Sequence, residues 1–272
     1  MLANSFRKYF QIFKVSFHQE FAYRLNFVMW RVRNILQIFI VFFLWDTIFS
    51  EPERVLFGYN RARILTYIFG LILVKAFVLS ARAVDVAGEI ARGNLSNYLL
   101  KPVSHFKYWL TRDVSSKGLN LVFAFCEIIL LYFLLKPPFF LQSNPFYILM
   151  FLLSLILASF IYFTILFITS FVPFWMPEAA WGSHFLVTFV IIEFLSGALF
   201  PLDVLPYSLQ TILSYTPFPY LIFFPLQVYL GKIAGKLLLK GVLVSIFWSF
   251  ILWFLMNSIW KKGLKVYQAY GG

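Results

Sequence analysis

The sequence is poor in cysteine and in charge. Its 272 residues include a single cysteine, Cys126, so no disulfide can form within the chain and no cysteine-based metal site is possible. Only 12% of the residues are charged, about half the share found in a typical soluble domain. Together with 61% hydrophobic residues and a mean hydropathy of +0.82, this excludes an ordinary soluble fold and indicates an integral membrane protein.

The sequence also lacks the short motifs of nucleotide-binding and catalytic sites. The segment 231–236 comes nearest to a P-loop, but its glycine spacing is wrong and the following hydroxyl residue is missing. Metalloprotease, hydrolase and paired-histidine motifs are absent, and His18, His105 and His184 lie in separate segments. We therefore expect this chain to bind no cofactor or metal itself and not to be an enzyme.

The charge that is present is mostly positive, with a formal net charge of +12. Such an excess can indicate nucleic-acid binding. Here the basic residues cluster beside apolar runs, where they set membrane orientation and meet anionic lipid. We therefore expect membrane lipids as partners and no nucleic acid.

Six apolar stretches are long enough to cross a hydrocarbon core of about 30 Å. They cover about residues 27–49, 63–82, 117–135, 144–172, 182–200 and 237–260. Ser115 or Ser116 is the expected cap of the third span, and Asn144 followed by a proline is the expected start of the fourth. Arg31 and Arg33, in the first turns of the first span, are expected to extend to the inner headgroups.

The first 25 residues differ from these spans because phenylalanines recur at helical spacing with basic residues on the opposite face. This pattern predicts an amphipathic helix in the membrane surface. The predicted fold class is therefore all-α integral membrane, with an interfacial helix at 1–25 and one six-span transmembrane domain at 26–272.

Orientation follows from the distribution of lysine and arginine. Fifteen of these residues fall on the side that holds both termini and the loop 85–112, and seven fall on the other side. Because cytoplasmic loops carry the excess of positive charge, both termini and this loop are predicted to be cytoplasmic.

Three charged residues fall inside predicted spans: Lys75, Glu127 and Glu193. An ionisable residue at this depth faces other helices or a wet path, because exposing it to lipid costs at least about 2.5 kcal/mol. We expect Lys75 to pair with one of the two carboxylates. A packing role and a role in a substrate or ion path both remain open.

Two connecting segments stand out. The helix of the second span is expected to continue past Arg82 into the loop 85–112 as far as Gly93, a suitable residue after a helix end. Pro102 bounds a second short helix that begins near Asn94 or Ser96. The segment 201–236 is apolar but rich in proline, so one straight span is implausible there. A pair of short helices that dips into the outer leaflet fits this pattern, provided that protein covers the backbone.

Several strings carry a family resemblance. Residues 194–206 (FLSGALFPLDVLP), 216–220 (TPFPY), 88–95 (GEIARGNL) and 98–102 (YLLKP) resemble type-2 ABC-transporter permeases, in particular a bacterial branch that works with a separate ATPase subunit. The similarity extends over nearly the whole chain, although no single string is as specific as a P-loop.

The resemblance implies a half-transporter of the bacterial inner membrane. Two copies, or this chain and a different sister permease, would form the path above a dimer of ABC ATPase subunits, which would bind ATP and Mg. The family mostly exports lipids, polysaccharides, drugs or peptides, so export is the expected direction.

The resemblance also assigns roles to the two connecting segments. The loop would couple to the ATPase through Gly88, Glu89, Arg92, Gly93, Leu95, Tyr98, Leu99 and Lys101. The outer hairpin, with Pro201, Asp203, Pro206, Pro217, Pro219 and Pro225, would cap the path.

Two other classes stay open. In an ion-gradient-driven secondary transporter, Lys75, Glu127 and Glu193 would act as a relay. A membrane-embedded enzyme or a scaffold is the third class, and the enzyme lacks a motif. The residues themselves do not identify the substrate.

Overall fold

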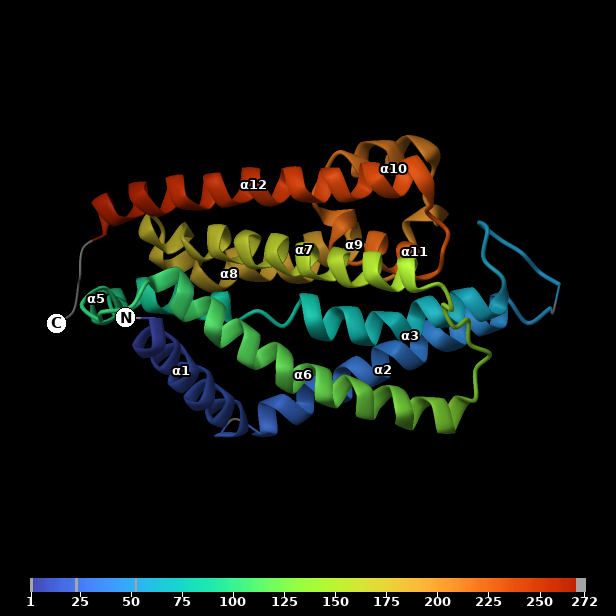
Figure 1. Cartoon of the computed structure of the whole chain (residues 1–272), viewed down its shortest axis with the longest axis horizontal. Coiled ribbons are helices and arrows are strands. Elements are labelled where there is room, and N and C mark those ends of the chain that lie inside the picture. Colours follow the sequence, from blue (N-terminus) through green and yellow to red (C-terminus); the bar gives the residue numbers. More distant parts are fainter. Residues whose placement is uncertain (1, 23, 52, 268–272) are drawn as a thin grey trace.

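A computed structural model describes residues 2–22, 24–51 and 53–267 of the chain. Within these ranges 79% of the chain is helical and no strand is formed, which confirms the all-α prediction. The long helices lie along a common axis (Figure 1). The start of α1, the short helix α5 and the end of α12 lie at one end of the bundle, while α10 and α11 lie toward the opposite end.

The N-terminal helix α1 (Leu2–Ala22) packs beside the first half of α6 (His105–Leu135), at an angle to the bundle (Figure 1). Two hydrogen bonds fix it there. The Ser115 hydroxyl donates to the backbone oxygen of Phe13 at 3.2 Å, and Lys8 Nζ donates to the backbone oxygen of Pro102 at 2.8 Å. The helix is as predicted, and its place in the membrane surface remains a prediction.

Four helical stretches of the described chain are long and apolar enough to cross a membrane: His105–Leu135, Pro145–Phe174, Pro177–Leu195 and Gly235–Val266. They correspond to α6, to α7 (Pro145–Ser170) with η2 (Val172–Phe174), to a composite helix, and to α12 (Gly235–Val266). The composite helix runs through η3 (Pro177–Ala179), α8 (Ala180–Phe185), the π-helical stretch η4 (Leu186–Ile192) and α9 (Glu193–Leu195). A bent pair, Arg61–Val78 with Arg82–Ala91, can form a fifth span. The remaining predicted span corresponds to α2 (Arg24–Ile48), and the complete six-span layout stays a prediction.

The core of the bundle is built around α7. The apolar window of this helix is 61% buried inside the chain, against 28% for α12 and 22% for α6. Phe163, Leu166 and Phe167 are buried along it, and α12, α11, α3 and α4 all pack against it. The other spans keep wide apolar faces open, as membrane helices do where lipid or a partner subunit covers them.

The second predicted span is not one helix. It consists of α3 (Arg61–Val78), a break, a 3-10 turn η1 (Arg82–Val84) and α4 (Asp85–Ala91), with a bend of 47°. We expected an unbroken helix past Arg82 to Gly93, and this expectation is wrong at residues 79–81. The end at Gly93 is confirmed, because Gly93 has a left-handed φ of 74° that favours glycine.

The helix boundaries correct one cap and confirm another. α6 begins at His105 with Ser104 at the cap position, so Ser115 and Ser116 are buried interior residues and not caps. The apolar run that defined the third span marks membrane depth, and the helix extends beyond it by about three turns. The start of α7 is as predicted, because the Asn144 side chain accepts a hydrogen bond from the Phe146 amide at 2.9 Å.

The proline-rich segment contains two short helices, α10 (Tyr207–Ser214) and α11 (Phe223–Tyr229), with the 3-10 turns η5 (Leu202–Val204) and η6 (Phe218–Tyr220). Helix α11 is buried against α7 and α3, with Leu226 and Val228 almost inaccessible. Protein therefore covers this apolar backbone, and its depth in the outer leaflet remains a prediction.

Candidate functional site

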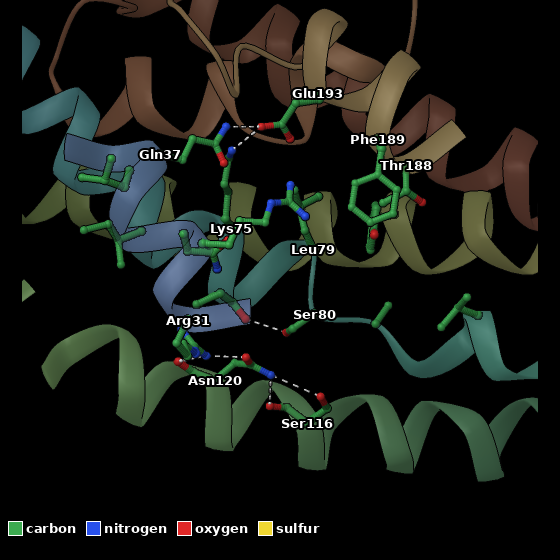
Figure 2. A pocket seen from close by; sticks show the side chains of 18 of the residues that line it. Arg31, Gln37, Lys75, Leu79, Ser80, Ser116, Asn120, Thr188, Phe189 and Glu193 are labelled. Atoms are coloured by element: carbon green, nitrogen blue, oxygen red, sulfur yellow. Dashed lines mark hydrogen bonds and ion pairs between the residues drawn. The ribbon is translucent and has the colours of Figure 1, made fainter. Parts of the chain in front are cut away.

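A cavity of about 600 Å³ lies at the break in the second span. It is bounded by α2, by α3 and the residues that follow it, by α6 and by α7 (Figure 2). The composite helix of η3, α8, η4 and α9, called the α8–α9 helix from here on, forms the remaining wall. Its charged lining residues are Arg31, Arg33, Lys75, Arg82, Glu127 and Glu193. All three intramembrane charges singled out in the sequence therefore line one cavity.

Lys75 and Glu193 form the ion pair on one wall. Lys75 Nζ lies 2.7 Å from Glu193 Oε1, and both side chains are mostly buried, at 21% and 16% exposed. Gln37 Nε2 donates to the same carboxylate oxygen at 2.8 Å. Figure 2 shows Lys75 and Gln37 converging on Glu193 from α3 and α2. The expected pairing of Lys75 with a carboxylate is thus present, and it joins three elements across the cavity.

Arg31 and Glu127 form the pair on the opposite wall. Arg31 Nη1 lies 3.2 Å from Glu127 Oε1, and the two side chains are 11% and 9% exposed. Arg31 also donates to the Asn120 side-chain oxygen and to its backbone oxygen (Figure 2). The expectation that Arg31 and Arg33 extend to the inner headgroups is wrong. A buried carboxylate and an amide on α6 offer Arg31 charge-assisted hydrogen bonds, and Arg33 lines the same cavity, with its guanidinium 5.3 Å from the Phe189 ring centre.

The break itself is held by a buried ion pair that the sequence analysis missed. Lys117 Nζ and Asp113 Oδ2 lie 3.1 Å apart on α6, with side chains 6% and 1% exposed. Asp113 accepts from the Arg82 amide at 3.2 Å, and Lys117 donates to the Val78 oxygen at 3.4 Å. The Val78 carbonyl before the break and the Arg82 amide after it would bond to each other in a continuous helix, and Lys117 and Asp113 satisfy them here.

A further hydrogen bond supports the same region from α7. The Ser170 hydroxyl donates to the Ala83 backbone oxygen at 2.9 Å. A broken helix at membrane depth is tolerated only where protein or a wet cavity satisfies its backbone. The spacing of four residues between Asp113 and Lys117 could have indicated this ion pair from the sequence, since residues four apart are neighbours on one face of a helix. From the sequence alone, Lys117 is instead the first residue of the third predicted span, at its cytoplasmic edge.

The predicted coupling loop is partly inside the bundle. Helix α4 packs against α7, η2 and α8, and Val86, Ala87 and Ile90 are buried. Leu95, which begins α5 (Leu95–Leu99), is fully buried. It cannot meet an ATPase, so its predicted contact is corrected: Leu95 belongs to the core of the chain itself.

The end of α5 has the accessible apolar surface. Leu99 is 46% exposed and Leu100 is 85% exposed. Tyr98 donates a hydrogen bond to Glu89 at 3.1 Å, and Lys101 Nζ lies 4.3 Å from the centre of its ring. Burial, followed by the nearby Tyr108 and Glu89, raises the pKa of Tyr98, so its hydroxyl keeps its proton as donor. These contacts tie α5 to α4 as one compact unit.

The outer hairpin is fastened by Asp203. Its Oδ2 accepts from the Tyr59 hydroxyl at 2.7 Å and from Gln227 Nε2 at 2.7 Å, and it pairs with Lys232 Nζ at 2.8 Å. Lys232 Nζ also lies 3.2 Å from the Tyr59 ring centre and donates to the Phe57 oxygen. Asp203 was selected from the sequence, whereas Tyr59 and Gln227 were not, because nothing in their spacing connects them to it.

The pKa shifts of this outer cluster have one main cause. Burial raises the pKa of Tyr59, and the Asp203 charge raises it further. Burial likewise lowers the pKa of Lys232, while Asp203 opposes that change. The cluster links the 49–60 loop to the hairpin at the end of the bundle opposite to α5 (Figure 1). The prolines of the hairpin set its turns, with Pro206 and Pro217 directly before α10 and η6.

These features define a multi-pass helical membrane protein with a charged cavity at a broken span. Residues 35–271 match the model of a family described as ABC-2 family transporter protein. No curated protein gives a match. Since the family match covers most of the chain, the chain belongs to the ABC-2 type transporter permeases, the membrane components of ABC transporters that partner with an ABC ATPase subunit.

Proposed function

We propose that this chain is the half-permease of an ATP-driven exporter in the bacterial inner membrane, with six spans and both termini in the cytoplasm. Two copies, or this chain and a sister permease, form the translocation path above two ATPase subunits, which bind ATP and Mg. The cavity beside Lys75 and Glu193 is part of the substrate path. The substrate is lipid-like, a polysaccharide or drug-like.

One observation carries this proposal: one continuous segment connects the end of the bundle that holds α5 to the cavity. Residues 79–82 line the cavity, η1 and α4 follow, with α4 roughly 10 Å long, and α5 lies at the end of the bundle that holds the start of α1 and the end of α12 (Figure 1). Because α4 is buried and α5 is tied to it, a displacement of α5 reaches the cavity without being lost in a flexible loop.

The dimer is supported by the surface of the α8–α9 helix. Only 6% of its apolar window is buried inside the chain, although the helix supplies Glu193 and Thr188 to the cavity. One side of this helix lines the cavity, and the chain leaves the other side uncovered. A second permease subunit can pack there and complete the path.

The ion-relay alternative finds less support. Glu193 pairs with Lys75 and Glu127 pairs with Arg31 on two different walls, so the three residues do not follow one another in a chain of proton donors and acceptors. The family match also favours an ATP-driven transporter.

The coupling role of α5 is tested by copurification with the cognate ATPase. Leu100→Asp places a charge on an 85% exposed side chain, so folding is retained while an apolar interface is opposed. We expect the amount of bound ATPase to fall at least about tenfold, which corresponds to about 1.4 kcal/mol. Leu141→Asp is the matched control, because Leu141 is 76% exposed in the loop between α6 and α7.

A Leu100→Asp variant that binds its ATPase and transports normally would contradict the assignment. In that case α1, which carries Arg7 and Lys14 and contacts the coupling loop through Lys8, becomes the next candidate. An ATPase that fails to bind even the unaltered chain would contradict the exporter itself.

A further inference from the structure

The charged side chains of the cavity already have partners within the chain. The two ion pairs lie on opposite walls, and Arg33 and Arg82 also interact with other residues. A charged ligand would have to displace one of these partners, so it would gain little from its charge alone. The selection of a ligand is therefore expected to depend on the uncharged residues of the lining.

The uncharged lining is rich in groups that both donate and accept hydrogen bonds. A ligand pocket usually places only a few polar groups among apolar side chains. Here amides and hydroxyls come from α2, from the break, from α6 and from η4 (Figure 2). They include Asn34, Gln37, Ser80, Ser116, Asn120 and Thr188. Such side chains match a ligand whose own groups donate and accept, as hydroxyls do.

Some polar groups of the lining have no hydrogen-bond partner in the described chain. The amide of Asn34, half-buried on α2, bonds to no described residue. His184 Nδ1 and Thr188 Oγ1 are buried, and neither forms a hydrogen bond of normal geometry with the described residues, although Tyr162 lies beside Thr188. Unpaired buried polar groups are costly, so we expect these side chains to rotate and pair with a hydrogen-bonding ligand. Thr188 also lies in the π-helical stretch, a form that is frequent at functional sites.

A row of aromatic rings lies on the same helix. Trp181 and Phe185 are stacked, with ring centres 5.0 Å apart and an angle of 19°, and Phe185 and Phe189 follow at 5.4 Å and 33°. Trp181 and Phe189 line the cavity, and Trp181 is 74% exposed. The row therefore places flat apolar faces beside the hydrogen-bonding groups of the lining.

We propose that the cavity binds a sugar unit of the transported molecule, that is, an uncharged ring with several hydroxyl groups. The apolar C–H face of the ring packs on the aromatic row. The hydroxyls at the edge of the ring bond to Asn34, Thr188 and the other polar groups of the walls. A volume of about 600 Å³ holds a drug-sized ligand, so it has room for a short oligosaccharide. This inference rests on the proposed transport function and names the substrate class.

An uncharged peptide is the nearest alternative, because its amides also donate and accept. Its polar groups alternate along a backbone, however, and do not surround a flat apolar face. The combination of aromatic faces with polar groups on several walls therefore favours the sugar, and the peptide serves as a comparison in the test.

Tryptophan fluorescence tests the proposal on the purified chain in nanodiscs of phosphatidylcholine. The probes are three uncharged trisaccharides, built from glucose, mannose and galactose, together with acetyl-trialanine amide and inorganic phosphate. The part of the fluorescence change that disappears in Trp181→Phe reports on the cavity. Trp175→Phe is the matched control, because Trp175 is 48% exposed in the turn before α8 and outside the cavity lining.

We expect at least one trisaccharide to saturate this part of the signal at a concentration at least about tenfold lower than the peptide or phosphate requires. Discrimination of this size is within the reach of a site that is built to bond hydroxyl groups. A signal that no trisaccharide produces would overturn the proposal. So would a signal that the peptide or phosphate produces at the lower concentration.

Two variants connect the binding to the uncharged lining. Asn34→Leu removes an amide that has no partner in the described chain, and Thr188→Val replaces a hydroxyl by a methyl group of similar size. We expect each to weaken trisaccharide binding at least about tenfold. Thr188→Val should leave the melting temperature unchanged or raise it, because it removes an unpaired buried polar group. Thr169→Val is the control, since the Thr169 hydroxyl bonds to the backbone of its own helix, α7.

Trisaccharide binding that survives both Asn34→Leu and Thr188→Val would also overturn the proposal. Thr188→Val keeps the test decisive if Asn34→Leu fails to fold. The binding assay contains no ATPase, so its failure leaves the exporter assignment standing. Failure of ATPase copurification leaves the sugar binding standing.

Discussion

Removing Asp113 should destabilise the protein strongly, because this carboxylate holds the break in the second span. It is 1% exposed, pairs with Lys117 at 3.1 Å and accepts from the Arg82 amide at 3.2 Å. Asp113→Ala leaves a buried ammonium without its partner and a backbone N–H without an acceptor. Breaking a buried pair in this way costs about 3–5 kcal/mol.

The double variant Asp113→Asn, Lys117→Met separates the ion pair from the hydrogen bond to the backbone. Asparagine can still accept from the Arg82 amide, and methionine removes the buried charge while keeping the length of the side chain. We therefore expect the double variant to recover most of the lost stability, as replacement of buried pairs by apolar groups often does. The change in unfolding free energy of the double variant, minus the sum of the changes for Asp113→Asn alone and Lys117→Met alone, measures the coupling between the two residues.

The assay is equilibrium unfolding in mixed micelles, followed by the loss of helical circular dichroism. Val114→Ala is the control, since Val114 is a neighbour on α6 that is 52% exposed, and a change within about 0.5 kcal/mol is expected. A loss below about 1 kcal/mol for Asp113→Ala would refute the reasoning. So would a double variant that is as unstable as the sum of both single ones.

Two further predictions concern packing and orientation. Gly241→Ala should lower stability by about 1–3 kcal/mol, because a Cβ there would overlap the Phe224 ring; Gly118→Ala, where a Cβ meets nothing within 4 Å, is the control in a thermal melt. Ser104→Cys in a Cys126→Ser background should react with an impermeant maleimide only after the cells are opened, because Ser104 is exposed at the predicted cytoplasmic end. Labelling in intact cells would show that the predicted orientation is wrong.

The sequence predicted those features of the fold that depend on composition and local chemistry. Apolar runs located the long helices, Asn144 marked the start of α7, and Gly93 marked the end of α4 because a left-handed residue follows the helix there. The pairing of Lys75 was predictable from the cost of an isolated charge among apolar helices. In each case one segment and one physical rule were enough.

The break between α3 and α4 was not predictable in the same way. Residues 79–81 contain neither proline nor glycine, the usual local causes of a kink. The break exists because groups far away in the sequence, Asp113, Lys117 and Ser170, bond to the backbone on either side of it. The cavity depends on this break, so most of the candidate site could not be located before the helices were placed.

Leu95 shows the same limit at the level of one side chain. A leucine beside a glycine-containing turn at the end of a bundle fits an interface and a core equally well, and only the packing of α4 and α5 decides between them. Leu99 lies one turn further along the same side of the short helix and Leu100 follows its end, yet both are accessible, so spacing alone does not separate them from Leu95.

The break also determines which parts of the chain a push on α5 can move. A continuous helix from Arg61 to Ala91 would transmit that push to the outer end, where Asp203 fastens the hairpin to Tyr59 and Lys232. With the break, the outer half α3 stays packed on α7 and α11, while α4 and α5 can shift as a unit. The break is closed by three hydrogen bonds and an ion pair and not by a continuous helical backbone. Motion is therefore expected first at residues 79–82, which line the cavity together with Lys75.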